Sequence, residues 1–88
     1  RPVSKLLYNS DNVRWVLFSL EPGQKIDRHE VSPQVTMIVL SGKGKLIIGK
    51  NIVEAKEGYM GICESMESHG FEAKERMTIL AAITPSPK

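Results

Sequence analysis

The sequence has a single cysteine, Cys63, so a disulfide within the chain is excluded. It also lacks a cluster of Cys and His at zinc-finger spacing, which excludes a structural zinc site as the support of a small fold. At 88 residues the chain has room for one domain, and a domain of this size buries only roughly 60 to 65% of its unfolded surface. Closure of a sheet on itself, or pairing of two copies, must therefore supply additional burial.

An excess of one charge and a long apolar run are also missing. The net charge is +2 and the twelve Lys and Arg are scattered along the chain, whereas nucleic-acid binding needs cations focused on one surface. The longest apolar runs, 37–40 and 79–83, are too short to cross a bilayer. Residues 1–9 contain no apolar stretch like that of a signal peptide. We therefore expect no nucleic-acid partner, no membrane partner and a location in the reducing cytoplasm, which the single cysteine also favours.

No internal repeat, low-complexity tract or linker interrupts the chain, so one domain is expected over 1–88, with its core over about 13–85. The apolar residues form short runs rich in Val, Ile and Leu, broken by Gly, Pro or Asn, which is typical of strands and turns. The one segment of helical composition, 71–77, is too short for a stable helix and contains a predicted turn at 74–76. Strands are predicted at 13–20, 24–29, 35–40, 45–48, 52–55, 59–63, 69–73 and 77–83, with a turn at 41–44 and a hairpin loop at 49–51.

Two of these strands are apolar on both faces. The faces are Val35, Met37 and Val39 against Thr36, Ile38 and Leu40 in one strand, and Trp15 and Leu17 against Val16, Phe18 and Leu20 in the other. The outer face of a one-layer barrel is exposed to water and should be polar. The pattern therefore predicts that something covers the apolar outer face of these strands. We expect the second copy in a homodimer to cover it. The alternative is that the N-terminal segment or a long loop covers this face.

Two segments resemble the paired motifs of the cupins. The segment from Gly23 to Gly42 is similar to the first motif, in which a Gly and five residues precede a His, one residue and a second His. A Glu follows that pair after four residues, and a Gly follows the Glu after seven. The segment from Gly58 to His69 is similar to the second motif, a Gly followed after about ten residues by one His ahead of the next strand. The resemblance covers about 13–85 and is greatest to short single-domain cupins with a C-terminal part like residues 69–75.

This resemblance implies an all-β fold, the cupin-type double-stranded β-helix or jelly-roll barrel, around a small cavity. In metal-binding cupins the cavity holds a divalent ion on three histidines and a glutamate. His29 matches the leading histidine of the first motif and His69 the histidine of the second, but Val31 and Val35 replace the second histidine and the glutamate. The Pro, Gly and Asn expected around the last histidine are replaced by Glu64, Met66 and Ala73.

Two histidines are one ligand short of a catalytic metal centre, which normally takes three protein ligands. A divalent ion such as zinc, iron, manganese or nickel, held by His29 and His69 alone, should bind weakly or only with substrate. Candidates for a third ligand are Glu30, Cys63 and Glu64. Glu30 follows His29 in a strand and should point away from the cavity. Cys63 can instead be a small buried apolar residue. Glu64 lies at a turn, where its side chain can instead be solvated. Without a metal, the imidazoles can orient a ligand, act as general base and acid, or only hydrogen-bond a neighbour.

Three functions remain open on the sequence, which does not decide whether the protein is an enzyme. A binding module that takes a small molecule in a mostly apolar cavity is favoured, because valines replace both missing ligands. The alternatives are a metal-dependent enzyme of dioxygenase or isomerase type and a structural dimer module. The first two depend on one geometric expectation, that the imidazoles of His29 and His69 meet inside the barrel.

Overall fold

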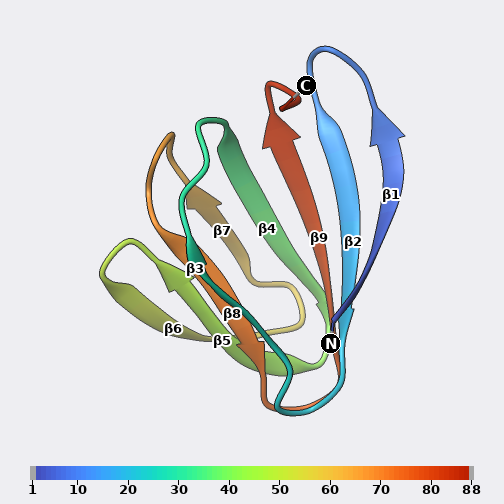
Figure 1. Ribbon diagram of the computed structural model, residues 1–88. Helices are drawn as coiled ribbons and strands as arrows, with labels where there is room; N and C mark the ends of the chain where they lie inside the picture. The colour runs from blue at the N-terminus through green and yellow to red at the C-terminus, as the bar shows by residue number, and fades with distance from the viewer. Residues whose placement is uncertain (1, 88) are drawn as a thin grey trace.

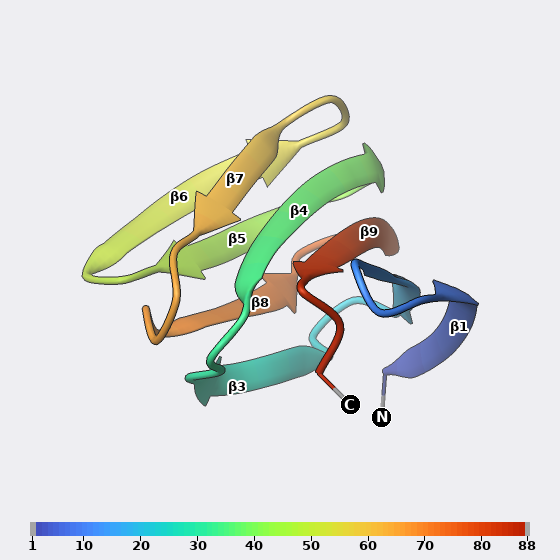
Figure 2. The same cartoon turned by 90° about the horizontal axis from the view of Figure 1, so that it is seen from above.

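The computed structural model describes residues 2–87, which form nine strands in two antiparallel sheets (Figure 1). The five-stranded sheet has the order β1-β2-β9-β4-β7 and the four-stranded sheet the order β3-β8-β5-β6. Figure 2 shows the two sheets facing each other. The strands are β1 (Val3–Asn9), β2 (Arg14–Leu20), β3 (Lys25–His29), β4 (Gln34–Ser41), β5 (Lys43–Ile48), β6 (Asn51–Lys56), β7 (Met60–Cys63), β8 (His69–Ala73) and β9 (Met77–Thr84). The predicted all-β jelly roll is confirmed, and residues 2–87 contain no helix that could span a membrane.

The core lies between the sheets and follows the period-2 alternation of the strands. In β4, Val35, Met37 and Val39 are at most 5% exposed, and the residues between them face the other way. Antiparallel register continues these inner rows into the neighbouring strands, where Met37 pairs with Ala81 and Val39 with Ile79. The facing sheet contributes Leu46, Ala55, Phe71 and Ala73. Of the two apolar faces of this strand, the one with Val35, Met37 and Val39 is therefore the inner face.

All eight predicted strands occur, with ends displaced by at most two residues. The predicted turn at 41–44 is wrong, because β4 continues to Ser41 and β5 begins at Lys43, so that Gly42 alone connects them. In the hairpin after β5, Ile48 pairs with Asn51 and the loop is only Gly49-Lys50. Gly49 has a φ of 60°, which suits the first position of a two-residue hairpin turn.

Strand β1 was not predicted and extends the sheet beyond the expected core of about 13–85. All seven of its residues are exposed, because β1 pairs only with β2 at the edge of the sheet. A register shift between Leu6 and Tyr8 further breaks the alternation. A strand with no buried face leaves no period-2 pattern in the sequence. The alternative that the N-terminal segment covers the outer face is also wrong, because β1 lies beside β2 and widens the sheet (Figure 1).

Candidate functional site

Strands β3 and β8 bring the two histidines together. His29 and His69 are paired across these antiparallel neighbours, and their ring centroids are 4.3 Å apart with the planes inclined by 55°. Gly70 permits the close approach, because a Cβ at this position would lie 2.7 Å from the carbonyl oxygen of Ile26 and 3.1 Å from the backbone nitrogen of Arg28. The two rings therefore meet as expected, although forty residues separate them along the chain. The expectation that both lie inside the barrel holds for His69 alone, because His29 is exposed.

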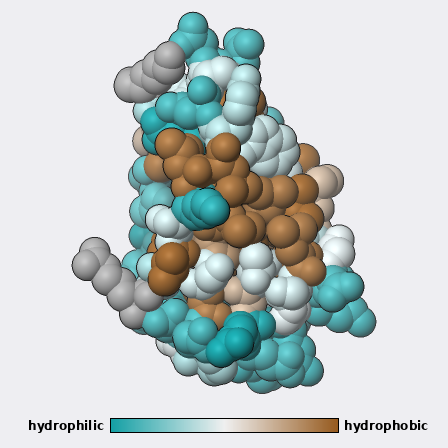
Figure 3. Space-filling model, turned by 90° about the vertical axis from the view of Figure 1, so that its right-hand side faces the viewer, coloured by the Kyte–Doolittle hydropathy of each residue, from teal (hydrophilic) through white to brown (hydrophobic). Residues whose placement is uncertain are grey.

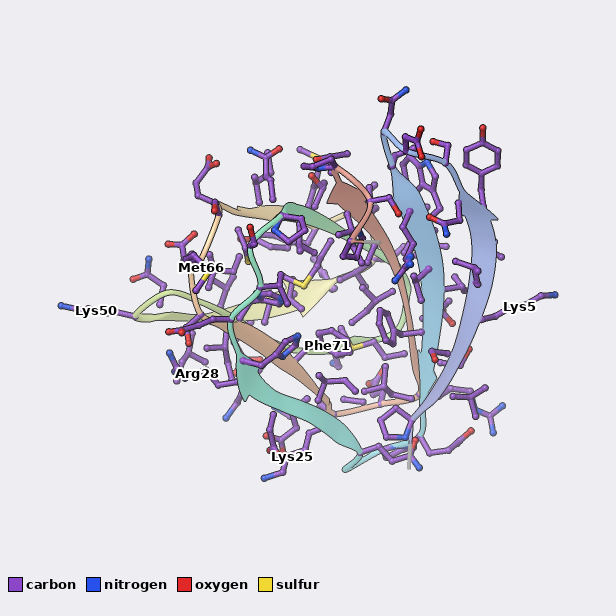
Figure 4. All side chains as sticks on the ribbon, turned by 45° about the horizontal axis from the view of Figure 1, so that its top comes forward. Lys5, Lys25, Arg28, Lys50, Met66 and Phe71 are labelled. Atoms are coloured by element: carbon purple, nitrogen blue, oxygen red, sulfur yellow. The ribbon has the colours of Figure 1, made fainter. Side chains whose placement is uncertain are left out.

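Both rings line a cavity of about 80 Å³ between the sheets. His69 is only 4% exposed and belongs to the buried wall, whereas His29 is exposed and lies where the cavity opens. In Figure 4, Phe71 points into the space between the sheets, and Arg28, the neighbour of His29, points away from it. The remaining lining residues are apolar: Phe18, Ile26, Val31, Val35, Met37, Phe71, Ala81 and Ile83. Two imidazoles thus provide the polar groups of an otherwise apolar cavity.

Each imidazole donates a hydrogen bond from Nδ1 to the carbonyl two residues earlier in the chain. The Nδ1 of His29 lies 3.0 Å from the carbonyl oxygen of Asp27, and that of His69 lies 3.1 Å from the carbonyl oxygen of Glu67. A carbonyl oxygen only accepts, so Nδ1 carries the ring proton in both residues and the neutral rings keep a lone pair on Nε2. The site therefore offers two hydrogen-bond acceptors, which are also potential metal ligands.

Burial lowers the pKa of His69 below its ordinary value of 6.5. The hydrogen bond to the Glu67 carbonyl opposes this shift, the neighbouring His29 adds to it, and the Glu67 carboxylate opposes it. Because the pKa is lowered overall, His69 is neutral at neutral pH and Nε2 remains an acceptor.

This lowered pKa makes the stability of the fold depend on pH. The unfolded chain binds more protons at residue 69 than the folded chain once the pH falls below 6.5, so the contribution is fully present above that value and is lost as the pH falls through the folded pKa. We expect urea unfolding to give a lower free energy at pH 5.5 than at pH 7.5, and His69→Gln to flatten this dependence. His29→Gln is the control and should keep most of the slope, because burial of His69 is the largest cause. A His69→Gln slope equal to that of the wild type would contradict the assignment.

The two valines that stand at the metal-ligand positions of the cupin motif lie in the cavity itself. Val31 and Val35 both line it, so methyl groups stand where the cupin resemblance expects a second histidine and a glutamate. Within residues 2–87, no group of three or more His, Cys, Asp or Glu side chains is arranged to hold a metal ion. The cavity lining offers two metal-binding side chains, both imidazoles. A catalytic metal centre normally needs three protein ligands. The metal role of His29 and His69 therefore stays a prediction.

None of the three candidates for a third ligand lines the cavity. Glu30 is exposed, as expected for the residue after His29, and Glu64 accepts a 2.8 Å hydrogen bond from Nε2 of Gln34. Cys63 is 1% exposed on the inner face of β7. Burial raises the pKa of its thiol to about 11, with further contributions from Glu67 and Glu64. A thiol with this pKa is protonated at neutral pH, which agrees with its interpretation as a small buried residue.

Several residues that shape the cavity were not identified from the sequence, among them Phe18, Ile26 and Phe71. Each was within a predicted strand, but alternation alone does not tell which stretch of an inner face is filled and which is left open. The edge-to-face contact of Phe18 with Phe71, at 5.2 Å between ring centroids, joins the two sheets beside the histidines. This contact needs both strands in their final register.

No family model matches the sequence, and no curated protein matches it either. Solved structures do match the fold. An RmlC-like cupin protein from Desulfovibrio desulfuricans superimposes with a TM-score of 0.89 at 27% identity, covering 97% of this chain and 83% of that one. The chain has a cupin fold. An RmlC-like cupin from Shewanella frigidimarina gives a TM-score of 0.94 at 13% identity, and the match covers 99% of this chain and 78% of that one.

A third cupin-fold neighbour, described as a predicted oxalate decarboxylase from Thermotoga maritima, has a TM-score of 0.90 at 22% identity, with 96% and 80% covered. The double-stranded β-helix implied by the motif resemblance is thus confirmed at the level of the fold. Function belongs to the site that a fold carries, so it has to be argued from the cavity and the two histidines.

Proposed function

We propose that this cupin barrel is a binding module for a small organic molecule with an apolar body and a hydrogen-bond donor, such as a hydroxyl group. The observation that carries the proposal is the pair of imidazoles, 4.3 Å apart between centroids, with both Nδ1 atoms already bonded to carbonyls. A donor on the ligand would bond to a free Nε2 lone pair, and the apolar wall would take the rest of the molecule.

The size of the cavity limits the part of the ligand that is enclosed. Its volume of about 80 Å³ exceeds the roughly 10 to 15 Å³ that one water needs and is smaller than the roughly 150 Å³ of an apolar cavity that binds benzene. A few non-hydrogen atoms would therefore be buried against His69 and the valines, and a larger ligand would extend past His29 at the opening.

Phenol and fluorobenzene form a matched pair of probes, because they have similar shapes and only phenol has a donor. We expect phenol to bind about 5- to 10-fold more tightly, which corresponds to roughly 1 kcal/mol for one neutral hydrogen bond. Titrations monitored by the ring resonances of ¹⁵N-labelled histidine would give both affinities and show which ring responds. His29→Ala should reduce the preference for phenol, while Glu30→Ala, which changes the exposed neighbour, should leave it intact.

Two results would contradict this function. Equal affinity for phenol and fluorobenzene would mean that the imidazoles do not recognise a donor. Failure of phenol and of the smaller isobutanol to shift any histidine resonance at millimolar concentration would mean that the cavity does not take such molecules at all.

A metal-dependent enzyme is the second candidate, and one observation favours it. Histidines that bind metals usually donate their other ring N–H to a carbonyl or carboxylate, as His29 and His69 do to the carbonyls of Asp27 and Glu67. A divalent ion such as zinc, iron, manganese or nickel could use the two Nε2 lone pairs, but with two protein ligands we expect weak binding.

The location of the protein in the cytoplasm also stays a prediction, which rests on the single cysteine.

A further inference from the structure

Strand β2 carries an arginine on its inner face. Because side chains alternate along a strand, Arg14 shares a face with Phe18, which lines the cavity, and with Leu20, which is 1% exposed. The other face of β2 carries Trp15 and Leu17, and hydrophobic side chains gather on the side of the molecule that contains β1 (Figure 3). The cation is therefore directed toward the facing sheet and not toward this hydrophobic surface.

Arg14 lies beside the cavity. It pairs with Ile83 of β9, which lines the cavity, and directly opposed residues of antiparallel strands have Cβ atoms roughly 4.5 to 5.5 Å apart. Strands β2 and β3 run in opposite directions from the turn that joins them (Figure 1). Arg14 at the start of β2 and His29 at the end of β3 therefore lie at the same end of the barrel, where the cavity opens.

The protein leaves the guanidinium of Arg14 incompletely satisfied. Its Nε is buried and has no hydrogen-bond partner among residues 2–87. Nη2 donates to the carbonyl oxygen of Pro87 at 3.3 Å, which is longer than the roughly 2.7 to 3.2 Å of an ordinary N–H···O bond. The three ion pairs within the described residues all involve other side chains. A buried donor without a partner destabilises a fold, so this group favours an acceptor that comes from a ligand.

We propose that Arg14 binds a carboxylate of the ligand in the cavity, so that the ligand is a small hydroxy acid with an apolar body. The inference rests on the proposed function, because it adds a second recognition group for the same ligand. The hydroxyl would donate to a free histidine Nε2, the body would lie against Phe18 and Ile83, and the carboxylate would lie at the opening. A carboxylate suits Arg14 because its two oxygens accept parallel bonds from Nε and one terminal nitrogen.

Binding of a carboxylate requires the exchange of one weak contact. The incoming oxygens would replace the Pro87 carbonyl as the acceptor for Arg14. Ser86 donates hydrogen bonds from its hydroxyl to Oδ1 of Asn9 and from its backbone nitrogen to the carbonyl oxygen of Asp11. These bonds keep residues 85–87 attached to the turn between β1 and β2 after the exchange.

The charges at the site favour a carboxylate over a phosphate. One guanidinium balances one negative charge, whereas a phosphate monoester carries about −1.5 to −2 at neutral pH. His69 adds no positive charge there, because burial lowers its pKa. Arg28, the neighbour of His29, points away from the cavity (Figure 4) and donates to the carbonyl oxygen of Gly49. Arg14 is therefore the cation that a single carboxylate would match.

The proposal is tested on the wild type with 4-hydroxybenzoate and 4-hydroxybenzamide. These probes have similar shapes and the same hydroxyl, and only the benzoate is charged. We expect the benzoate to bind about 10-fold more tightly, the lower end of the range for a hydrogen bond to a charged group. In protein with ¹⁵N-labelled arginine, the Nε–H resonance of Arg14 should shift with the benzoate and stay in place with the benzamide.

Two matched variants identify the arginine that is responsible. Arg14→Met removes the charge and keeps an unbranched side chain, so the preference for the benzoate should disappear. Its affinity for phenol, which has no carboxylate, should change by less than about 2-fold, because the partner of the hydroxyl is unchanged. Arg28→Met removes the other arginine beside the histidines and should retain the preference.

The failure of this inference is distinguishable from the failure of the proposed function. Equal affinity of the wild type for the two probes would overturn the carboxylate site, while a histidine resonance that still shifts with phenol would keep the binding function. A preference lost in Arg28→Met and retained in Arg14→Met would also overturn it. If neither probe nor phenol shifts any histidine or arginine resonance, both the function and the carboxylate site are wrong. If Arg14→Met does not fold, the Nε–H resonance of the wild type decides.

Discussion

Replacing Val31 by His and Val35 by Glu in one chain is expected to create a tight divalent-metal site. Both valines line the cavity together with His29 and His69, so the change raises the donors there from two to four. Four-ligand zinc sites bind with apparent free energies of roughly 10 to 16 kcal/mol, so each missing ligand matters greatly. We expect zinc or nickel to bind the double variant at least about 1000-fold more tightly than the wild type, or roughly 4 kcal/mol.

The same substitutions should make the stability of the fold depend on bound metal. Val35 is 5% exposed, so a glutamate there is costly to bury without a partner, and the metal-free variant should unfold below the wild type. Saturating metal should raise its free energy of unfolding by about 3 kcal/mol at 100 times the dissociation constant. Competition titrations against a chelator, combined with urea unfolding, measure both effects.

Two controls separate ligation from other effects of these substitutions. Val31→Ala with Val35→Ala changes the same positions without adding donors and should bind metal no more tightly than the wild type. Adding His69→Ala to the His and Glu variant should weaken metal binding strongly. A double variant that binds metal no better than the wild type would show that these four side chains do not converge, and it would remove the metal-dependent enzyme as a candidate function.

Substitution of Gly42 by Ala is expected to have the largest effect on stability among the glycines. Gly42 is the sole residue between β4 and β5 and has a φ of 78°. A Cβ there would lie 1.9 Å from the carbonyl oxygen of Arg76, which is backbone and cannot turn away. The left-handed conformation costs a non-glycine residue roughly 1 to 2 kcal/mol, and overpacking typically adds about 1 to 3 kcal/mol. We therefore expect a loss of about 2 to 5 kcal/mol.

Gly23→Ala is a matched control, because Gly23 has a similar φ of 85° but a Cβ would meet nothing within 4 Å. It should cost only the roughly 1 to 2 kcal/mol of the backbone conformation. Urea unfolding at pH 7.5 compares the two variants. Equal losses would mean that the contact with Arg76 relaxes freely, and that the junction of β4 and β5 tolerates a side chain.

These predictions depend on different parts of the fold, and the sequence anticipated them unequally. The positions of Val31 and Val35 relative to His29 came from the motif resemblance, and the cavity lining agrees with it. The role of Gly42 was misjudged as part of a four-residue turn. Its tight contact comes from Arg76, which follows 34 residues later and approaches only when β9 pairs with β4. A local pattern has no information on a contact of this kind.

Local order in the chain was sufficient for most of the architecture. Alternation of apolar residues and the Gly, Pro and Asn between them predicted eight strands, because a strand's two faces and its turns are specified by consecutive residues. The two cupin-like segments predicted the jelly roll, and they identified His29 and His69 as the residues that meet at the cavity.

Tertiary structure was required wherever the relevant partner is distant in the chain or is solvent. Edge strand β1 has no buried face, so it became visible only through its pairing with β2. The exposure of His29 against the burial of His69, and the Nδ1 hydrogen bonds that free both Nε2 atoms, depend on how β3 and β8 meet. The mostly apolar outer face of the five-stranded sheet likewise arises from four strand pairings in register. Hydrophobic periodicity is a property of one segment, whereas a cavity and a surface are properties of several segments at once, which explains this division.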